Sequence, residues 1–180
     1  VKEMKFDAIV GNPPYQEETA QAQSTTNGQA PRTNVFQYFQ MISDELSCGV
    51  VSLIYPGARW IHRFGKGLAQ FGLNQINDKT LVRVDFYQDA NEIFKDVAIA
   101  DGITVVYKNK SKVGDGFEYV YHRGNETIAV HMDYPGEQLL PLNPNDGSII
   151  SKVNGFVDEK HLQFMFDRVL PRTLYGIESN

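Results

Sequence analysis

The sequence predicts an α/β fold with a partly parallel sheet. Two continuous apolar runs of strand length, Phe6–Gly11 and Gly49–Pro56, each meet residues that stop a strand, and a segment with helical spacing lies between them. Strand, helix and strand in this order are typical of parallel strands joined by a crossover helix. Two further strands, a β-rich region and a last helical segment are expected to follow.

The composition fits one folded domain and argues against a free-standing nucleic-acid-binding domain. The chain has 180 residues, 42% of them hydrophobic, which is enough to bury a core. Its formal net charge is −5, whereas DNA-binding surfaces rely on lysine and arginine, so any DNA contact is expected to be local. No apolar run has the length of a membrane helix. The single cysteine, Cys48, excludes an internal disulfide, is expected to be a core thiol, and favours a cytoplasmic setting.

Phe6–Gly11, with the sequence FDAIVG, is predicted to be a buried strand with a fixed end. Pro13 and Pro14 follow it and have no N–H to donate, so the hydrogen-bond ladder has to stop there. Behind Tyr15, the segment Gln16–Thr33 is polar and without apolar periodicity, which predicts a loop.

A helix is predicted directly after this loop. Thr33 or Asn34 is expected to cap its N-terminus. The apolar residues at helical spacing, which are expected to pack, are Val35, Phe39, Ile42 and Leu46. Gly49–Pro56 then supplies a run whose unbroken apolar character is typical of a central parallel strand covered on both faces.

The middle of the chain is predicted to form another helix and a pair of strands. The helix is expected around Gly67–Ile76, and the strands begin near Leu81 and Gly102. Because the connection between these strands is too short for a crossover helix, they are predicted to form an antiparallel hairpin at the edge of the sheet. A basic run before the helix is interpreted as a solvated helix face rather than a set of phosphate contacts; it comprises Arg59, His62, Arg63 and Lys66.

A boundary is predicted near residue 112. It divides residues 1–112, which carry the α/β pattern, from residues 113–180, whose pattern shifts to alternating residues. A β-hairpin is expected around Gly124 and Asn125. Its residues of interest are Tyr119, Tyr121, His122 and Arg123. Asp158–Leu170 is predicted to be a closing amphipathic helix, and the four histidines lack the spacing of a metal site.

The residues Asn12-Pro13-Pro14-Tyr15 carry the chemistry that the sequence suggests. They follow a predicted parallel strand, and open α/β sheets bind ligands at the carboxyl ends of their strands. An exocyclic aromatic amine is a poor nucleophile because its lone pair is delocalised into the ring. The Asn12 amide oxygen and the Pro13 carbonyl can accept its two hydrogens and free that lone pair. Tyr15 offers a flat surface for an extruded base.

With this motif the sequence resembles the amino-methyltransferases that use S-adenosylmethionine. More closely, it resembles the adenine-specific DNA methyltransferases of type II restriction-modification systems, including those fused to an endonuclease. The resemblance covers roughly the first 110 residues and extends through NVFQYFQMISDEL, YPGARW and VRVDFYQDANEIFKDVAIADGITVVYKN. It implies the later strands of a Rossmann-like methyltransferase fold, and methyl transfer from S-adenosylmethionine to a flipped adenine of double-stranded DNA.

The resemblance also implies roles for individual residues. Asn12 and Pro13 are expected to hold the target amine, Pro14 to keep the turn rigid, and Tyr15 to stack on the base. In the family a second aromatic residue from the later hairpin loop often clamps the other face of the base. Phe94 is the candidate here, and an ordinary core or hairpin position is an equally good interpretation of it.

The chain departs from the family in one large respect. The family binds its cofactor with a glycine-containing loop and an acidic residue that both precede the Asn-Pro-Pro-Tyr strand, and this chain has neither. We therefore interpret it as the later part of a methyltransferase that is inactive alone, with most of the cofactor site absent. Residues 1–112 are then the later half of a catalytic domain, and residues 113–180 are the start of a target-recognition or linker region. The hairpin around Gly124 and Asn125 either reads base edges or is a plain surface hairpin. The edge of Phe6–Gly11 is then unpaired and apolar, and we predict that it pairs with another copy of the chain or is covered by a rearranged element.

Other functions stay open from the sequence. Methylation of RNA adenine, or of a glutamine side chain in a protein, uses the same motif, although NVFQYF and the long polar loop do not look like the glutamine-modifying family. A truncated, non-catalytic DNA-recognition or interaction module is the alternative from a different class. The missing cofactor half favours this alternative for the chain by itself.

Overall fold

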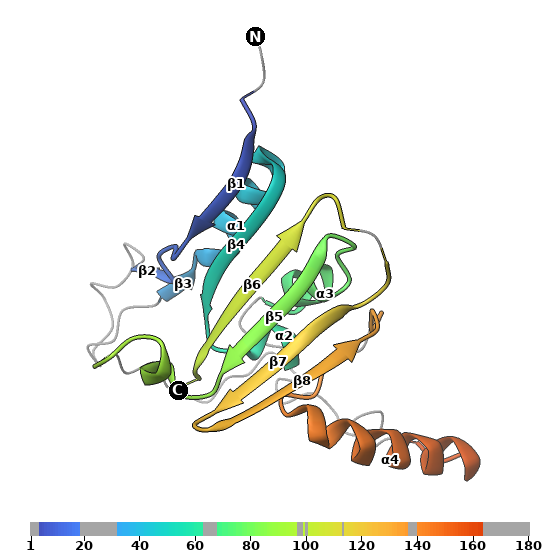
Figure 1. Ribbon diagram of the computed structural model, residues 1–180. Helices are drawn as coiled ribbons and strands as arrows, with labels where there is room; N and C mark the ends of the chain where they lie inside the picture. Colours follow the sequence, from blue (N-terminus) through green and yellow to red (C-terminus); the bar gives the residue numbers. More distant parts are fainter. Residues whose placement is uncertain are drawn as a thin grey trace, which may run out of the picture. The chain divides into compact units, whose positions relative to one another are not determined.

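The computed structural model describes residues 4–18, 32–62, 68–96, 99, 101–112, 114–136 and 140–163. The chain separates into two compact units, Val1–Pro144 and Asn145–Asn180. The first unit has the predicted α/β fold, with a six-stranded sheet in the order β1-β4-β6-β5-β7-β8 (Figure 1). The strands are β1 (Phe6–Gly11), β4 (Ser47–Pro56), β5 (Leu81–Tyr87), β6 (Ile103–Asn109), β7 (Phe117–Arg123) and β8 (Glu126–Met132).

β1 and β4 run parallel, as the sequence predicts for two strands joined by a crossover. The crossover contains the helix α1 (Phe36–Leu46) and a short antiparallel ribbon of β2 (Gln16–Glu18) and β3 (Arg32–Asn34). The prediction of a plain loop over 16–33 is thus wrong at its two ends, because their backbone groups pair with each other. Residues 19–31 lie outside the described part of the chain.

β5 and β6 form the predicted antiparallel pair, but this pair does not end the sheet. β6 lies between β4 and β5, β7 pairs parallel with β5, and β8 pairs antiparallel with β7. The prediction of an edge hairpin is wrong because the hairpin of β7 and β8 continues the same sheet. The functional boundary near residue 112 stays a prediction, since one sheet can carry two roles.

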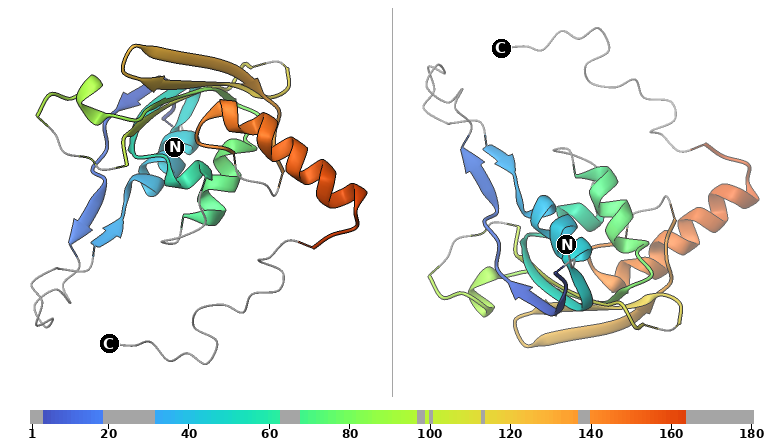
Figure 2. Two further views of the ribbon diagram at one scale, coloured as in Figure 1. Left: turned by 90° about the horizontal axis from the view of Figure 1, so that it is seen from below. Right: turned by 90° about the horizontal axis from the view of Figure 1, so that it is seen from above.

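Helices cover one face of this sheet. α1, α2 (Arg59–His62) and α3 (Ala69–Ile76) all lie on the same side (Figure 2). Along β4, the buried positions alternate with partly exposed ones, and the buried apolar residues are Val51, Leu53 and Tyr55. The prediction that this strand is covered on both faces is therefore wrong within the described residues, where the helices cover a single face.

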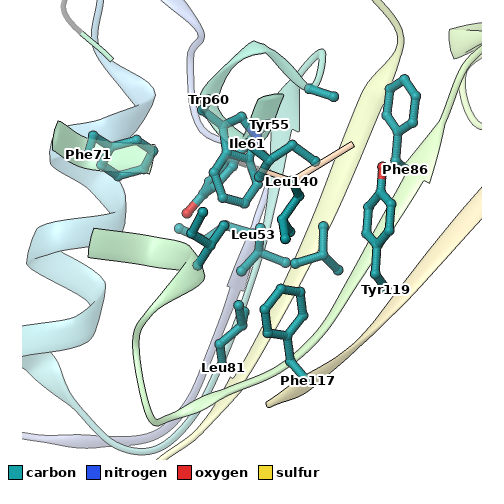
Figure 3. Close-up of a cluster of buried hydrophobic side chains, with 14 of the residues drawn as sticks. Leu53, Tyr55, Trp60, Ile61, Phe71, Leu81, Phe86, Phe117, Tyr119 and Leu140 are labelled. Atoms are coloured by element: carbon teal, nitrogen blue, oxygen red, sulfur yellow. The ribbon is translucent and has the colours of Figure 1, made fainter. Parts of the chain in front are cut away.

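The core lies between the covered face and the helices, and aromatic side chains dominate it (Figure 3). The Trp60 ring packs edge-on against Tyr55, with centroids 5.4 Å apart, and its Nε1 donates to Thr104 Oγ1 at 3.0 Å. Gly72 permits the close approach of α3 to α2, because a Cβ there would lie 1.7 Å from the Trp60 carbonyl oxygen. These contacts fix α2 and α3 on the sheet.

α1 forms where the sequence predicts it but packs with a different face. Its buried residues are Phe36, Gln40 and Ser43. Phe39 and Ile42, which were predicted to pack, are 42% and 54% exposed. The predicted packing face is therefore wrong, because polar residues occupy the stripe that contacts the sheet.

A buried polar network explains this choice of face. The Tyr55 hydroxyl donates to Gln40 Oε1, and Gln40 Nε2 donates to Asp44 Oδ1 at 2.6 Å. Lys108, which is 1% exposed, donates to Asp44 Oδ2 at 2.8 Å and to Asp78 Oδ2 at 2.7 Å. Gln40 and Lys108 both have partners for their polar groups, so their burial is tolerated.

The helix boundaries differ from the sequence predictions in two places. The N-cap of α1 is Val35, without a side-chain cap, because Thr33 and Asn34 belong to β3. In the second unit the helix is α4, Gly147–Glu159. The predicted closing helix over 158–170 is wrong over residues 160–163, which are not helical, whereas Asp158 and Glu159 form the end of α4; residues 164–170 lie outside the described part. No described helix is long and apolar enough to cross a membrane.

β1 is an edge strand with an open side, and five of its six residues are exposed, so the prediction of a buried strand is wrong. Among the described strands it pairs only with β4, and Phe6 and Val10 are 40% and 74% exposed. Cys48, at the start of β4, is also exposed, so its prediction as a core thiol is wrong. Its Sγ lies against the Phe6 carbonyl oxygen at 3.5 Å and Asp7 Oδ1 at 3.6 Å.

Candidate functional site

The turn Asn12-Pro13-Pro14-Tyr15 leaves the sheet directly after β1 and is held at both ends. Pro13 is buried, whereas Asn12 and Pro14 are exposed and Tyr15 is half-buried. The Tyr15 carbonyl oxygen accepts a hydrogen bond from the Val35 N–H at 3.1 Å, which ties the turn to the start of α1. The turn therefore presents the Asn12 side chain at the surface on a fixed backbone.

The Tyr15 ring is partly enclosed beside Asn12. Its hydroxyl oxygen is buried and makes no well-formed hydrogen bond to a described residue. Burial raises the pKa of the Tyr15 phenol above its ordinary value, and the neighbouring Asn12 side chain offsets part of this effect. The Tyr15 phenol is therefore neutral at physiological pH.

The turn after β1 shares an edge of the sheet with the loop after β5. β6 runs antiparallel to both β4 and β5, so β1, β4, β5 and β7 all point the same way. Ile103 lies opposite both Pro56 and Tyr87, so β4 and β5 end at the same level. Figure 1 shows the carboxyl ends of these four strands at one end of the sheet.

Phe94 lies in the loop after β5 and is half-buried. The loop begins with a short 3-10 helix, η2 (Ala90–Glu92), and the Phe94 N–H donates to the Ala90 carbonyl oxygen at 2.9 Å. Among the described aromatic rings, Phe94 makes no contact with Tyr15. The structure thus brings the two residues to one edge of the sheet but not together, and the base clamp stays a prediction.

Two of the four hairpin residues considered for base reading lie in the core. Tyr119 and Tyr121 are 0% and 3% exposed, so they cannot reach a base. Burial raises the pKa of Tyr119 far above its ordinary value, and its hydroxyl donates to the Leu142 carbonyl oxygen at 2.7 Å. His122 is half-buried, whereas Arg123 is exposed at the tip of the hairpin.

A charged network on β5 and β7 was missed by the sequence analysis. The Arg83 guanidinium donates to both carboxylate oxygens of Asp85, at 2.6 and 2.7 Å, and to Glu118 at 2.7 Å. His122 Nε2 lies 2.9 Å from Asp85 Oδ1, and its ring stacks on Tyr87 with centroids 4.2 Å apart. Burial alone would raise the pKa of Asp85, but Arg83 and His122 outweigh it and lower that pKa. The alternating charges of VRVDFYQD were the available signal.

The basic run predicted before α3 is described only in part. Arg63 and Lys66 lie outside the described residues. His62, in α2, has its Nδ1 2.6 Å from the Ala58 carbonyl oxygen. The interpretation of this run as a solvated helix face stays a prediction.

The residues of the turn fit a substrate amine rather than a nucleotide cofactor. An amide oxygen on Asn12, a carbonyl on Pro13 and a ring on Tyr15 are two acceptors and a stacking surface. A nucleotide cofactor at the end of a parallel strand is held by a glycine-rich turn and a carboxylate, and the turn after β1 contains neither. We therefore assign no residue of this turn to S-adenosylmethionine. The described residues also contain no cluster of histidine, cysteine or carboxylate side chains that could hold a metal ion.

Comparison with known families places this turn and sheet in context. The family model described as Eco57I restriction-modification methylase matches residues 1–94, slightly more than half of the chain. The chain belongs to the Eco57I restriction-modification methylase family. The matched segment of this methylase-family chain contains both the Asn-Pro-Pro-Tyr turn and Phe94. A search of curated proteins gives no significant match.

Solved structures with a similar fold include methyltransferase subunits of type I systems. The methyltransferase subunit of the type I restriction-modification system from Streptococcus thermophilus is 18% identical with a TM-score of 0.47, over 71% of this chain and 29% of that one. The M protein of the type I restriction enzyme EcoKI is also 18% identical, with a TM-score of 0.44, over 66% of this chain and 25% of that one. The methylase-family chain thus spans less than a third of either structure.

Proposed function

We propose that this chain is the substrate-binding part of an adenine-N6 DNA methyltransferase of a restriction-modification system, of the type II class that the sequence resembles. The observation that carries the proposal is the turn Asn12-Pro13-Pro14-Tyr15 at the carboxyl end of β1, in a chain of the Eco57I family. Double-stranded DNA is the substrate in this proposal. S-adenosylmethionine is the methyl donor, and it is held by residues other than those described.

In the proposed complex an adenine leaves the duplex and enters the site with its amine first. Asn12 Oδ1 and the Pro13 carbonyl oxygen each accept one of the two amine hydrogens, which directs the nitrogen lone pair away from the ring. The buried Pro13 and the bond from Val35 to Tyr15 keep these acceptors in position before the base arrives. Tyr15 stacks on the base as a neutral phenol, and Phe94 is proposed to approach the other face.

A non-catalytic DNA-recognition module is the second candidate function. The observation that favours it is that the turn after β1 contains neither the glycine-rich loop nor the carboxylate of a nucleotide-cofactor site. The two functions predict different chemistry for the same turn, since only the enzyme modifies the base that the turn binds.

The experiment is to express the protein from its complete reading frame in a bacterial host without adenine methylation and to locate N6-methyladenine by single-molecule sequencing. We expect methylation at one sequence motif. Asn12→Ala should reduce its rate by about a hundredfold or more, because a preorganised hydrogen-bonding group at the reacting atom is lost. Asn74→Ala, which removes an exposed amide on α3, is the matched control and should leave the rate unchanged.

Two results would change the assignment. If Asn12→Ala methylated DNA as fast as the wild-type protein, the turn would not be the site of the chemistry. If the wild-type protein bound DNA without modifying it, the non-catalytic module would replace the enzyme.

A further inference from the structure

The tip of the β7–β8 hairpin is bonded to the loop that carries Phe94. The Gln88 N–H donates to the His122 carbonyl oxygen at 3.1 Å, and the Tyr121 hydroxyl donates to Gln88 Oε1 at 2.7 Å. Further along the loop, the Gly124 N–H donates to Glu92 Oε1 at 3.1 Å. The loop is thus attached to the hairpin at two positions, one at its start and one within η2.

Between these attachments the loop is closed by its own hydrogen bonds. Asp89 Oδ1 accepts from the Asn91 N–H at 2.9 Å, and the Glu92 N–H donates to the Asp89 carbonyl oxygen at 3.1 Å. The N–H of Phe94 donates to the carbonyl oxygen of Ala90, a residue that is 2% exposed. Residues 89–94 therefore form one turn that is closed by its own hydrogen bonds.

Glu92 is the outer attachment of this turn. Its side chain is exposed and joins two backbone segments that are 32 residues apart in the sequence. A carboxylate that accepts from a backbone N–H forms a charge-assisted bond, which is stronger than a neutral one. Gly124 lies in the turn of the hairpin with a φ of 58°, so its N–H direction is set by the hairpin itself.

We infer that the β7–β8 hairpin sets the position of Phe94 at the base site, with Glu92 and Gln88 as positioning residues. This inference rests on the proposed function, in which Phe94 clamps the flipped adenine. The bonds of Gln88 hold the start of the loop at the end of β5. The bond of Glu92 to Gly124 holds the orientation of the loop relative to the hairpin. A hairpin beyond the matched family segment thereby influences base stacking through the loop that it holds.

The test compares Glu92→Ala with two matched variants in the protein expressed from its complete reading frame. Glu92→Gln keeps an acceptor oxygen for the Gly124 N–H, and Glu126→Ala removes the same charge from the hairpin at an exposed position. The probe is a duplex that carries 2-aminopurine in place of the methylated adenine, whose fluorescence reports an unstacked base. Methylation rate, duplex affinity and thermal midpoint are measured for each variant.

We expect Glu92→Ala to lower the methylation rate about tenfold and to change the 2-aminopurine signal, with duplex affinity held within about twofold. Glu92→Gln and Glu126→Ala should behave like the wild-type protein. A merely structural role would lower the thermal midpoint and the active fraction instead, without separating base stacking from duplex affinity. Wild-type behaviour of Glu92→Ala in rate and fluorescence would overturn the inference.

Failure of the proposed function is recognised separately. It would appear as a wild-type protein that neither methylates DNA nor changes the 2-aminopurine signal. Amide hydrogen exchange over residues 88–94 then tests whether Glu92 attaches the loop to the hairpin. Faster exchange in Glu92→Ala than in Glu92→Gln supports this attachment, and equal exchange in the two variants overturns it.

Discussion

At the scale of single residues, Lys108 shows how a charge is kept inside the first unit. Its side chain is 1% exposed, and Asp44 and Asp78 both lie within 2.8 Å of its Nζ. Removing one partner of a buried ion pair is costly because the remaining charge is left without full compensation. The three residues belong to β6, α1 and the turn before β5, so the ionic contact also joins these elements.

Asp78 should make the stability of this unit depend on pH. Burial by itself raises the pKa of Asp78, but the hydrogen bonds and charge of Lys108, with two bonds from Thr80, leave it below its ordinary value of 3.8. Because the folded-state pKa is the lower one, ionised Asp78 stabilises the fold above the unfolded-state pKa. This contribution is lost as the pH falls through the folded-state value.

We expect Asp78→Asn to lower the free energy of unfolding at neutral pH by about 1–3 kcal/mol and to weaken the loss of stability on acidification. Urea denaturation at several pH values, followed by the fluorescence of the single tryptophan, Trp60, measures both effects. Asp133→Asn, at a side chain that is 95% exposed, is the control and should change neither. An unchanged pH dependence in Asp78→Asn would contradict the role of this pair.

At the scale of elements, α1 packs through polar side chains and leaves apolar ones in water. Gln40 is fully buried between the Tyr55 hydroxyl and Asp44, whereas Ile42 is 54% exposed. From hydrophobicity alone, Ile42 would be expected to be buried and Gln40 to be exposed. The contribution of each residue to stability should follow its contacts, since an unpartnered buried hydroxyl costs more than an exposed methyl group.

Gln40→Ala should therefore lower the free energy of unfolding by about 1–3 kcal/mol, because the Tyr55 hydroxyl loses its acceptor. Ile42→Ala, the matched truncation on the same helix, should cost less than about 0.5 kcal/mol. Urea denaturation followed by Trp60 fluorescence compares the two variants. Equal losses of stability would show that the polar stripe does not hold α1 on the sheet.

At the scale of the whole first unit, β1 has one side on which no described strand pairs with its backbone N–H and C=O groups. Exposed large apolar residues lie just before β1, on β1 and on α1; they are Met4, Phe6, Val10, Tyr38, Phe39, Met41 and Ile42. An edge strand with unpaired backbone groups and apolar side chains is a template for pairing with another strand. The prediction that a second copy or another element covers this edge is therefore retained.

We expect the chain by itself to self-associate through β1 and Val10→Lys to shift it toward the monomer. A charge on an edge strand opposes pairing with a second strand. Sedimentation velocity over a range of concentrations measures the effect. Ala129→Lys places the same charge at an exposed position of β8, the opposite edge of the sheet, and should leave the association unchanged. A strictly monomeric wild-type chain would contradict pairing with another copy.

The sequence predicted the features that depend on neighbouring residues. The strand Phe6–Gly11, its stop at Pro13 and Pro14, the helix over Phe36–Leu46 and the antiparallel pair of β5 and β6 all follow from local apolar patterns and turn residues. The Asn-Pro-Pro-Tyr turn was identified in the same way. The geometry of this turn depends on neighbouring residues, because Pro13 and Pro14 each lack an N–H donor and restrict the backbone.

Only the tertiary structure decided where these elements go and what they contact. In the structure, β6 lies between β4 and β5, and Glu92 accepts a hydrogen bond from the Gly124 N–H. Four polar or partly polar side chains are buried in the core; they are Gln40, Lys108, Tyr119 and Tyr121. The physical reason is that each outcome depends on partners that lie far apart in the sequence, such as Lys108 and Asp44, 64 positions apart. A local pattern encodes the cost of burying a polar group, whereas the partner that offsets this cost is supplied by the fold.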